Sequence, residues 1–251
     1  MQRIVIQISY DGSDFSGWQI QKSVRTVQGT IERAISEIAK TDIKITGSGR
    51  TDSGVHALRQ YAHFDFPIDM TEKQIKLALR TKFPNDIGIN EVYKVKDDFH
   101  ARYDAIKRTY KYFIATTKTP FNRRFTSYFS RFDLNLDRIK RCLPYFLGKH
   151  DFTSFSKFNP DINNYICNIK IFRVTKKDER IIFTISANRF LHHMVRRIIG
   201  TILNIVNNEK KGFVIKSLFK NKTPNDKLIT TAPAQGLFLT DVKYSKEYRI
   251  Q

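Results

Sequence analysis

The sequence predicts an α+β fold, with mostly antiparallel strands in mixed sheets and helices on one face. Two observations lead to this class. Strand-like runs are mixed with amphipathic helix patterns in both parts of the chain, and several strands are separated by short polar turns. The 251 residues, of which 41% are hydrophobic, are enough to form a substantial core.

The first part of the chain is predicted to form a strand, a helix and then two further strands. Residues 3–9 are expected to form a buried strand that ends at the Asp11-Gly12 turn signal. From Thr26 to Lys40, apolar residues recur every three or four positions, which predicts an amphipathic helix capped by Thr26. Residues 43–45 form a short predicted strand before a glycine-rich turn. Residues 60–66 then alternate in polarity, as in a strand.

A second helix and two strands follow. Residues 71–83 match a helix pattern with a cap-like Thr71. Residues 87–95 are strand-like, 97–102 form a loop, and 106–116 form a strand. On that strand, one face carries an arginine beside two tyrosines: Arg108, Tyr110 and Tyr112.

A basic, aromatic connection without clear periodicity covers residues 117–132 and includes Arg123, Arg124 and Arg131. We expect the chain to divide here. The predicted halves are residues 1–116, which carry the glycine-rich turn, and residues 117–251, which carry the longest predicted helix and a closing strand.

The second half repeats the mixture of strands and helices. Pro144 predicts a kink or an early end in a helix over residues 136–147. The remaining predicted elements are a loop at 150–155, a hairpin of strands 165–175 and 180–187, helices at 188–207 and 213–219, and a strand at 237–244. Gly200 costs the long helix about 1 kcal/mol relative to alanine, so we expect a close packing contact there.

The charge of the chain favours a polyanionic partner. The 44 Lys and Arg against 24 Asp and Glu give a formal net charge of +20, more than solubility requires. Contacts with phosphates release condensed counterions, so such a surface binds nucleic acid with little sequence preference. A bias toward Lys, Ile and Asn is the alternative explanation, but it does not account for the clustered arginines. Nucleic acid is the favoured partner.

The cysteines and histidines favour neither a disulfide framework nor a metal site. Cys142 and Cys167 are far apart in sequence, and no CxxC or paired Cys/His spacing for zinc is present. A reducing cytoplasm fits this usage, and we expect no export leader or membrane segment. His192 and His193 are neighbours on the predicted helix 188–207 and would point about 100° apart, which disfavours a metal site.

The most informative stretch is the glycine-rich turn at residues 47–54, where Asp52 lies close to Arg50. Three glycines within eight residues allow positive φ angles or the close approach of a ligand. This pattern is typical of a functional loop, and Asp52 is its candidate site residue. The spacing is equally consistent with a surface turn in which Asp52 hydrogen-bonds its own backbone.

Arg196 is a second candidate, because it lies within an otherwise apolar predicted helix. A buried arginine requires an anionic partner, although an exposed arginine on the solvent face is the alternative. The sequence has no Walker loop, no GxGxxG after a strand and no GxSxG, which disfavours nucleotide hydrolysis and redox chemistry.

Seven blocks of sequence occur in order along almost the whole chain. They are Tyr10-Asp11-Gly12 with Gly17-Trp18-Gln19, GRTDSGVHA at 49–57, DFHAR at 98–102, RTYKY at 108–112, DFTSF at 151–155, FLHHMVR at 190–196 and GLFL at 236–239. Together they strongly resemble the tRNA pseudouridine synthase A family. Ser48 and Ser53 stand where that family usually has alanine, and Leu58-Arg59 lies in a variable stretch. None of these departures removes a polar group that the chemistry needs.

The resemblance implies a pseudouridine synthase fold, with two similar halves around a basic central cleft. It implies an isomerase that acts in tRNA modification and converts uridine to pseudouridine in the anticodon stem-loop, at positions 38, 39 and 40. A cytoplasmic homodimer that binds tRNA and requires no cofactor or metal is also expected from the resemblance.

Roles for individual residues follow from the same resemblance. Asp52 is expected to be the nucleophile, and Arg50 to help flip the target nucleotide and fill its place. Tyr110 is expected to stack on the flipped base and to aid proton transfer, and Arg196 to form a salt bridge with Asp52. Each residue type suits its role, since an aspartate beside cations stays ionised and tyrosine is a flat platform with a titratable tip. Further tRNA contacts are expected from His56, His100, Arg102, Arg108 and His193.

Two alternatives come from other classes of protein. One is a catalytically silent tRNA-binding or RNA-chaperone protein of the same fold, which the intact set of Asp52, Arg50, Tyr110 and Arg196 disfavours. The other is an RNA-cleaving enzyme with Asp52 as acid or base, which the absence of a His/Lys pair or a carboxylate cluster disfavours. The sequence leaves open whether Asp52 attacks the sugar or the ring.

Overall fold

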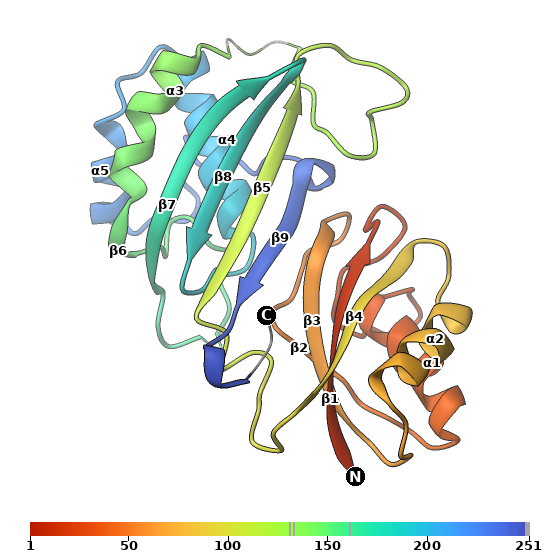
Figure 1. Cartoon of the computed structure of the whole chain (residues 1–251). Helices are drawn as coiled ribbons and strands as arrows, with labels where there is room; N and C mark the ends of the chain where they lie inside the picture. Colours follow the sequence, from red (N-terminus) through yellow and green to blue (C-terminus); the bar gives the residue numbers. More distant parts are fainter. Residues whose placement is uncertain (131, 133, 161, 249–251) are drawn as a thin grey trace. The chain divides into compact units, whose positions relative to one another are not determined.

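The chain forms two compact units, which we call unit 1 (Met1–Lys107 with Phe238–Gln251) and unit 2 (Arg108–Leu237). The computed structural model describes residues 1–130, 132, 134–160 and 162–248 (Figure 1). Arg131 of the basic connection lies outside these residues. The halves predicted from the sequence, 1–116 and 117–251, remain a proposal about the organisation of the chain. Among the described residues, no helix has the length and apolarity needed to cross a membrane.

Unit 1 is a sheet with two helices on one face (Figure 1). The strand order is β4 (Ile87–Val95), β1 (Gln2–Tyr10), β3 (His56–Phe66) and β9 (Leu237–Lys243), and the short β2 (Thr46–Gly47) also pairs with β3. All of these pairs are antiparallel except β3 with β9, in which His56 lies opposite Phe238. The helices are α1 (Val27–Ala39) and α2 (Glu72–Lys82).

Both helices of unit 1 begin at the predicted caps. The hydroxyl of Thr26 accepts the N–H of Gly29, which satisfies one of the free donors of the first turn. Thr71 and Gln74 form a capping box, in which each side chain accepts the other residue's backbone N–H. These contacts explain why the predicted starts of α1 and α2 are confirmed.

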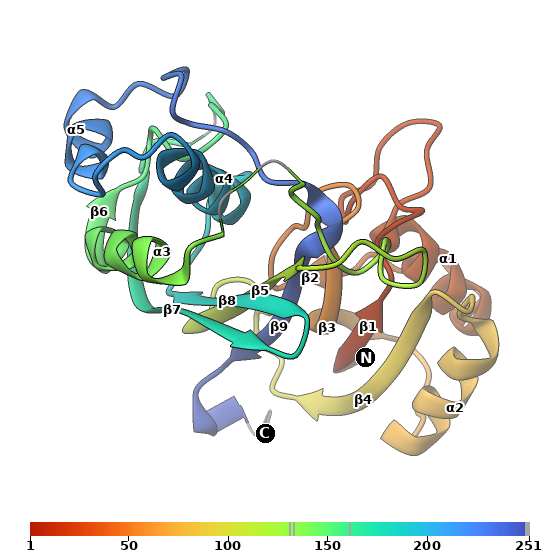
Figure 2. The same ribbon diagram turned by 90° about the horizontal axis from the view of Figure 1, so that it is seen from above.

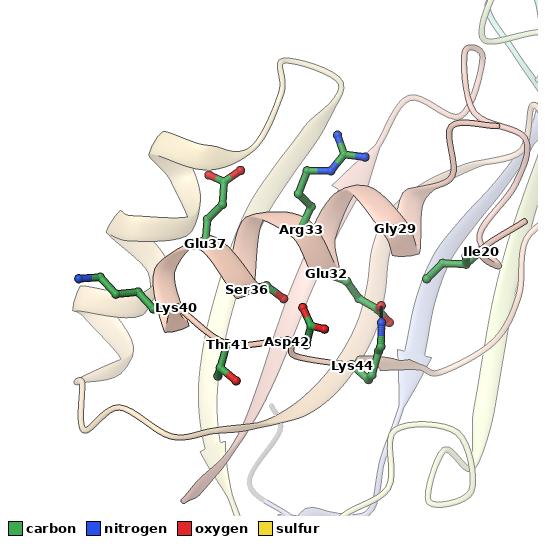
Figure 3. A pocket seen from close by; sticks show the side chains of 10 residues that line it. All are labelled: Ile20, Gly29, Glu32, Arg33, Ser36, Glu37, Lys40, Thr41, Asp42 and Lys44. Atoms are coloured by element: carbon green, nitrogen blue, oxygen red, sulfur yellow. Dashed lines mark hydrogen bonds and ion pairs between the residues drawn. The ribbon is translucent and has the colours of Figure 1, made fainter. Parts of the chain in front are cut away.

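The predicted strand at residues 43–45 is wrong. The N–H of Ile43 donates to the hydroxyl of Ser36 at 2.9 Å, and the N–H of Ile45 donates to the carboxylate of Glu32 at 3.1 Å. Because these donors are bound by side chains of α1, they cannot form a strand ladder. Glu32 is buried and pairs with Lys44 at 3.2 Å, at the edge of a surface pocket beside α1 (Figure 3).

Unit 2 is an antiparallel sheet with its helices on one face (Figure 2). The strand order is β5 (Lys107–Ala115), β8 (Arg180–Ala187), β7 (Ile166–Lys177) and β6 (Gly148–Asp151). The helices are α3 (Leu136–Cys142), α4 (Met194–Asn207) and α5 (Val214–Asn221). Short 3₁₀ turns lie at Leu143–Phe146, Ala234–Gly236 and, in unit 1, Lys246–Tyr248. The predicted α+β class, with mostly antiparallel sheets and helices on one face, is confirmed.

Two predicted boundaries in unit 2 are wrong. His150 and Asp151 belong to β6 rather than to a loop, because they pair with Cys167 and Ile166. The long helix begins at Met194 rather than at residue 188. The predicted early end of the helix at Pro144 is confirmed, since α3 ends at Cys142 and a 3₁₀ turn follows.

The late start of α4 has a local cause. His193 has a φ of +61°, which is outside the helical region, and the N–H of Asn188 donates to the carbonyl of Asn168 on the neighbouring strand. Within α4, the expected close contact at Gly200 is confirmed. A Cβ atom there would lie 2.4 Å from the carbonyl oxygen of Thr230.

Candidate active site

The turn that carries Asp52 joins β2 to β3 and is held at several backbone positions. The N–H of Ser48 donates to the carbonyl of Tyr61 at 2.7 Å, and the N–H of Trp18 donates to the carbonyl of Thr51 at 3.0 Å. The carbonyl of Asp52 accepts the N–H of Val55 at 3.1 Å, which closes the turn. These bonds fix the backbone on both sides of Arg50 and Asp52.

Two glycines are required by this geometry. Gly54 has a φ of +75°, which few other residues adopt readily. Gly17 has a φ of +88°, and a Cβ atom on it would lie 2.8 Å from the carbonyl oxygen of Thr51. The segment around Gly17 therefore packs directly against the turn. Arg50 is exposed and Asp52 is half-buried at its surface.

Three buried polar side chains below the turn were not identified from the sequence. Gln60 on β3 is 0% exposed, and its amide bonds to Ser48 and to the carbonyl of Gly49. The hydroxyl of Tyr10 lies 2.8 Å from the hydroxyl of Thr51. In the sequence, Gln60 is only a strand residue, and Tyr10 and Thr51 are only members of the blocks that carry the resemblance, because no local pattern shows which distant side chains meet.

His56, a predicted tRNA contact, is 1% exposed in unit 1. Its Nδ1 accepts the N–H of Gly12 at 3.0 Å and lies 3.1 Å from a carboxylate oxygen of Asp11. The ring stacks on Phe238 of β9, with the ring centres 4.5 Å apart. These contacts join the start of β3 to the turn after β1 and to β9.

The predicted contacts His100 and Arg102 lie in the loop after β4. Nδ1 of His100 accepts the N–H of Arg102 at 3.2 Å, and the ring lies 4.9 Å from that of His63 on β3. Arg102 is exposed. Burial, reinforced by the nearby charges of His100 and Arg3, lowers the pKa of His63 to about 4, so this ring is neutral at pH 7.

Unit 2 carries Tyr110 and Arg108 on β5. Tyr110 is 8% exposed, and its ring packs edge-on against Phe190 with the centres 5.1 Å apart. Arg108 is half-buried and donates to the carbonyl of Asn188 at 2.9 Å. Tyr112, two residues along the same face of β5, is fully buried, and its hydroxyl donates to the carbonyl of Pro233 at 2.9 Å. The predicted alternation along β5 is confirmed.

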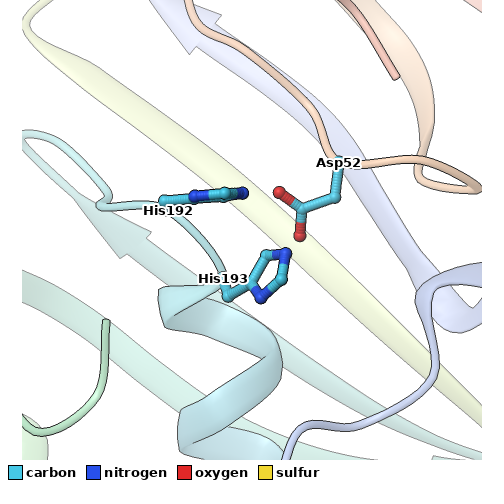
Figure 4. A group of neighbouring side chains, drawn as sticks. All are labelled: Asp52, His192 and His193. Carbon is cyan, nitrogen blue, oxygen red and sulfur yellow. The ribbon is translucent and has the colours of Figure 1, made fainter. Parts of the chain in front are cut away.

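His193 immediately precedes α4, and Arg196 lies in its first turn. The rings of His192 and His193 lie 4.2 Å apart and are tilted by 62°, since neither residue is within the helix (Figure 4). The prediction that these rings point apart on a helix is therefore wrong. Arg196 is half-buried, and its Nε donates to the carbonyl of Ala232 at 2.8 Å. Ala232 returns its own N–H to the carbonyl of Arg196 at 3.0 Å.

Groups of metal-ligand side chains and reactive cysteines are two further kinds of chemical site. Taken unit by unit, the described residues contain no group of three His, Cys, Asp or Glu side chains that converge as metal ligands. Cys142 and Cys167 are buried free thiols, and burial raises the pKa of each to about 11. Both cysteines are therefore inert packing residues.

The arrangement within unit 1 suits nucleophilic chemistry on a polyanion. A carboxylate on a turn fixed by hydrogen bonds is held in place for attack. The exposed guanidinium two residues before it can bind phosphate or fill a vacated position in a base stack. In unit 2, an aromatic side chain and two arginines lie on regular elements, which provide a rigid support.

Comparison with known proteins gives consistent matches. The family model described as "tRNA pseudouridine synthase" matches residues 6–104 and 143–245. The tRNA pseudouridine synthase A of Bacteroides fragilis is 38% identical over 251 residues, covering 98% of this chain and 98% of that protein. The protein of the same name from Leuconostoc mesenteroides is 37% identical and is covered completely. A tRNA pseudouridine synthase A 1 of Bacillus cereus is 38% identical and is also covered completely.

Proposed function

This chain belongs to the tRNA pseudouridine synthase family, and we propose that it isomerises uridine to pseudouridine in the anticodon stem-loop of tRNA, at positions 38, 39 and 40. The match to proteins named tRNA pseudouridine synthase A, at 37–38% identity over nearly the whole chain, carries the proposal. The net charge of +20 supports it, because tRNA is a polyanion.

The reaction is an isomerisation, so no atom is gained or lost overall. The bond between N1 of uracil and C1′ of ribose breaks, the freed ring rotates, and a bond forms between C5 and C1′. The hydrogen on C5 leaves as a proton, and N1 takes up a proton. No electron acceptor or donor is required.

Asp52 is the proposed nucleophile. Its carboxylate adds either to C1′ or to the uracil ring, and in both cases it must be ionised. The hydrogen bonds that fix Ser48 and Thr51 on either side of Arg50 support this role, because they hold the turn in one conformation before the substrate binds.

The other proposed roles concern the substrate base and the charge of Asp52. Arg50 assists flipping of the target nucleotide and occupies its place in the stack. Tyr110 stacks on the flipped base and moves a proton, and Arg196 is the salt-bridge partner of Asp52. Further tRNA contacts come from Arg102, Arg108, His100, His193 and His56. We place His56 last in this set, since it is 1% exposed in unit 1.

The proposal also covers the oligomeric state, the compartment and the surface that binds tRNA. We propose that the protein acts as a cytoplasmic homodimer and that tRNA binds in a basic cleft between two similar halves. The excess of Lys and Arg over Asp and Glu supports such a cleft, and two buried free thiols fit a reducing compartment.

The test replaces the nucleophile and measures binding and turnover separately. Asp52→Ala is expected to abolish pseudouridine formation, measured as tritium released from C5-labelled uridine in tRNA. Its affinity for tRNA, measured by filter binding, is expected to stay within about twofold of wild type, because phosphate contacts dominate binding. Loss of binding with retained turnover would contradict the proposed role of Asp52.

A further inference from the structure

Gln60 connects β3 to the turn that carries Asp52. Its Oε1 accepts the hydroxyl of Ser48 at 2.5 Å, and its Nε2 donates to the carbonyl of Gly49 at 2.9 Å. Ser48 is 1% exposed and Gln60 is 0% exposed. One buried amide therefore binds the two residues that immediately precede Arg50.

Tyr10 extends this network to the other side of Arg50. Its hydroxyl lies 2.8 Å from that of Thr51. Burial raises the pKa of Tyr10, and the neighbouring side chains of Thr51 and Gln60 act in the opposite direction. Tyr10 is 4% exposed and Thr51 is 7% exposed. Gln60 therefore binds residues 48 and 49, and Tyr10 binds residue 51, on the two sides of Arg50.

The pairing of β3 with its neighbours does not require an amide at position 60. Gln60 lies opposite Ile8 in the β1–β3 ladder, and Ala62 and Phe64 on the same strand are buried apolar residues. A buried amide costs free energy unless its polar atoms are hydrogen-bonded, and an apolar side chain would avoid that cost. The amide is therefore explained by the turn that it binds.

The turn itself needs such a constraint. Glycines at positions 47, 49 and 54 leave its backbone with more accessible conformations than other residues would. A Cβ atom added to Gly49 would meet no atom within 4 Å, so packing does not hold this residue in place. Fully bonded buried networks select one conformation from such alternatives.

We propose that Gln60, together with Tyr10 and Thr51, is a positioning network for the catalytic turn. It fixes the backbone at residues 48, 49 and 51, so that Arg50 and Asp52 are presented in the geometry that the reaction requires. This inference rests on the proposed function. The network is expected to act on the rate of the chemical step and not on the affinity for tRNA.

Matched substitutions test the network. Thr51→Val keeps the shape of the side chain and removes the hydroxyl, whereas Thr51→Ser keeps the hydroxyl. Gln60→Met removes both amide contacts at a similar side-chain length. Thr201→Val is the control, because Thr201 is a fully buried threonine on α4 whose hydroxyl has no hydrogen-bond partner among the described residues.

Single-turnover rates of pseudouridine formation and the Kd for tRNA are measured for each purified variant, with thermal unfolding as the check on folding. Thr51→Val and Gln60→Met are expected to lower the rate at least about 10-fold with a Kd within twofold of wild type, because small displacements of reacting groups are costly. Thr51→Ser is expected to keep most of the rate, and Thr201→Val all of it.

The outcomes separate this inference from the proposed function. If wild-type protein forms no pseudouridine, the proposed function fails. If wild type is active and Thr51→Val is folded and equally active, the positioning network fails. Equal losses in Thr51→Val and Thr201→Val, or a loss confined to tRNA affinity, would also overturn it. If the Gln60→Met variant does not fold, the comparison of Thr51→Val with Thr51→Ser decides whether the network positions the turn.

Discussion

Gly200→Ala is the substitution for which the structure gives the clearest magnitude. A Cβ atom at this position would lie 2.4 Å from the carbonyl oxygen of Thr230 and 2.9 Å from the nitrogen of Ala232. Both are backbone atoms, so no side-chain rotation can relieve the overlap. Either α4 or the segment 230–232 must move by about 1 Å to restore an ordinary contact.

Two opposing effects set the change in stability. Alanine favours the helix by about 1 kcal/mol relative to glycine. Overpacking a close contact typically costs about 1–3 kcal/mol, and the upper part of this range, about 2–3 kcal/mol, applies here because the contact is with backbone. We therefore expect Gly200→Ala to lower the free energy of unfolding by about 1–2 kcal/mol and the Tm by about 2–8 °C.

The same overlap is expected to affect activity. Ala232 accepts the Nε–H of Arg196 at 2.8 Å and donates its N–H to the carbonyl of Arg196 at 3.0 Å. Displacement of residues 230–232 therefore moves the proposed partner of Asp52. We expect the rate of pseudouridine formation to fall about 10-fold or more, while the affinity for tRNA stays nearly unchanged.

Gly29→Ala in α1 is the matched control. A Cβ atom there would lie 3.1 Å from the side-chain oxygen of Thr26 and 3.5 Å from a side-chain carbon of Ile20, and both side chains can adjust. We expect no loss of activity and a stability within about 0.5 kcal/mol of wild type or higher. Thermal unfolding and single-turnover assays compare the two variants. Equal stability and activity of Gly200→Ala and wild type would refute the reasoning.

Three further substitutions test other parts of the account. Tyr110→Phe keeps the stacking ring but loses the hydroxyl, so turnover should fall about 100-fold at constant tRNA affinity; an unimpaired variant limits Tyr110 to stacking. The pKa of His63 is lowered from an unfolded value of 6.5 to about 4, so protonation favours the unfolded chain below pH 6.5. Between pH 7 and 4.5, urea titrations should show wild type losing about 2 kcal/mol more than His63→Gln, and parallel curves would contradict this. Thr71→Ala removes the capping box of α2 and should cost about 1 kcal/mol in thermal unfolding, whereas no change in Tm would show that the cap is dispensable.

Elements with local signals could be predicted from the sequence. The period of the apolar residues and a threonine cap define α1 and α2, and both depend on residues within a few positions of one another. The strand β4 at Ile87–Val95 was predicted with its observed bounds. The hairpin of β7 and β8 followed from two β-rich runs around a polar turn, where Asp178 has a φ of +52°.

Boundaries set by distant contacts could not be predicted in this way. Residues 43–45 have the composition of a strand, but side chains of Ser36 and Glu32 bind two of their N–H groups. The strand β3 begins at His56 rather than at Gln60, and both of its faces are buried from Gln60 to Phe64, so polarity does not mark its start. The apolar pattern of α4 extends back to Leu191, but the positive φ of His193 delays the helix.

The candidate site shows the same division. The motif GRTD identified the turn, and the resemblance assigned roles to Asp52, Arg50, Tyr110 and Arg196. The buried side chains that hydrogen-bond to the turn could not be predicted from the sequence, because Gln60, Tyr10 and Thr51 come together only in the folded unit 1. Similarly, nothing in the sequence indicated that Phe190 packs against Tyr110 or that Ala232 binds Arg196.

The central claim is that this protein forms pseudouridine in tRNA without cutting the chain. The most direct measurement incubates unmodified tRNA with the purified wild-type protein, in buffer without added cofactor or metal, and maps every modified position. We predict pseudouridine at positions 38, 39 and 40 where uridine is present, in full-length tRNA. Intact uridine at these positions after demonstrated binding, or cleaved ends, would contradict the claim.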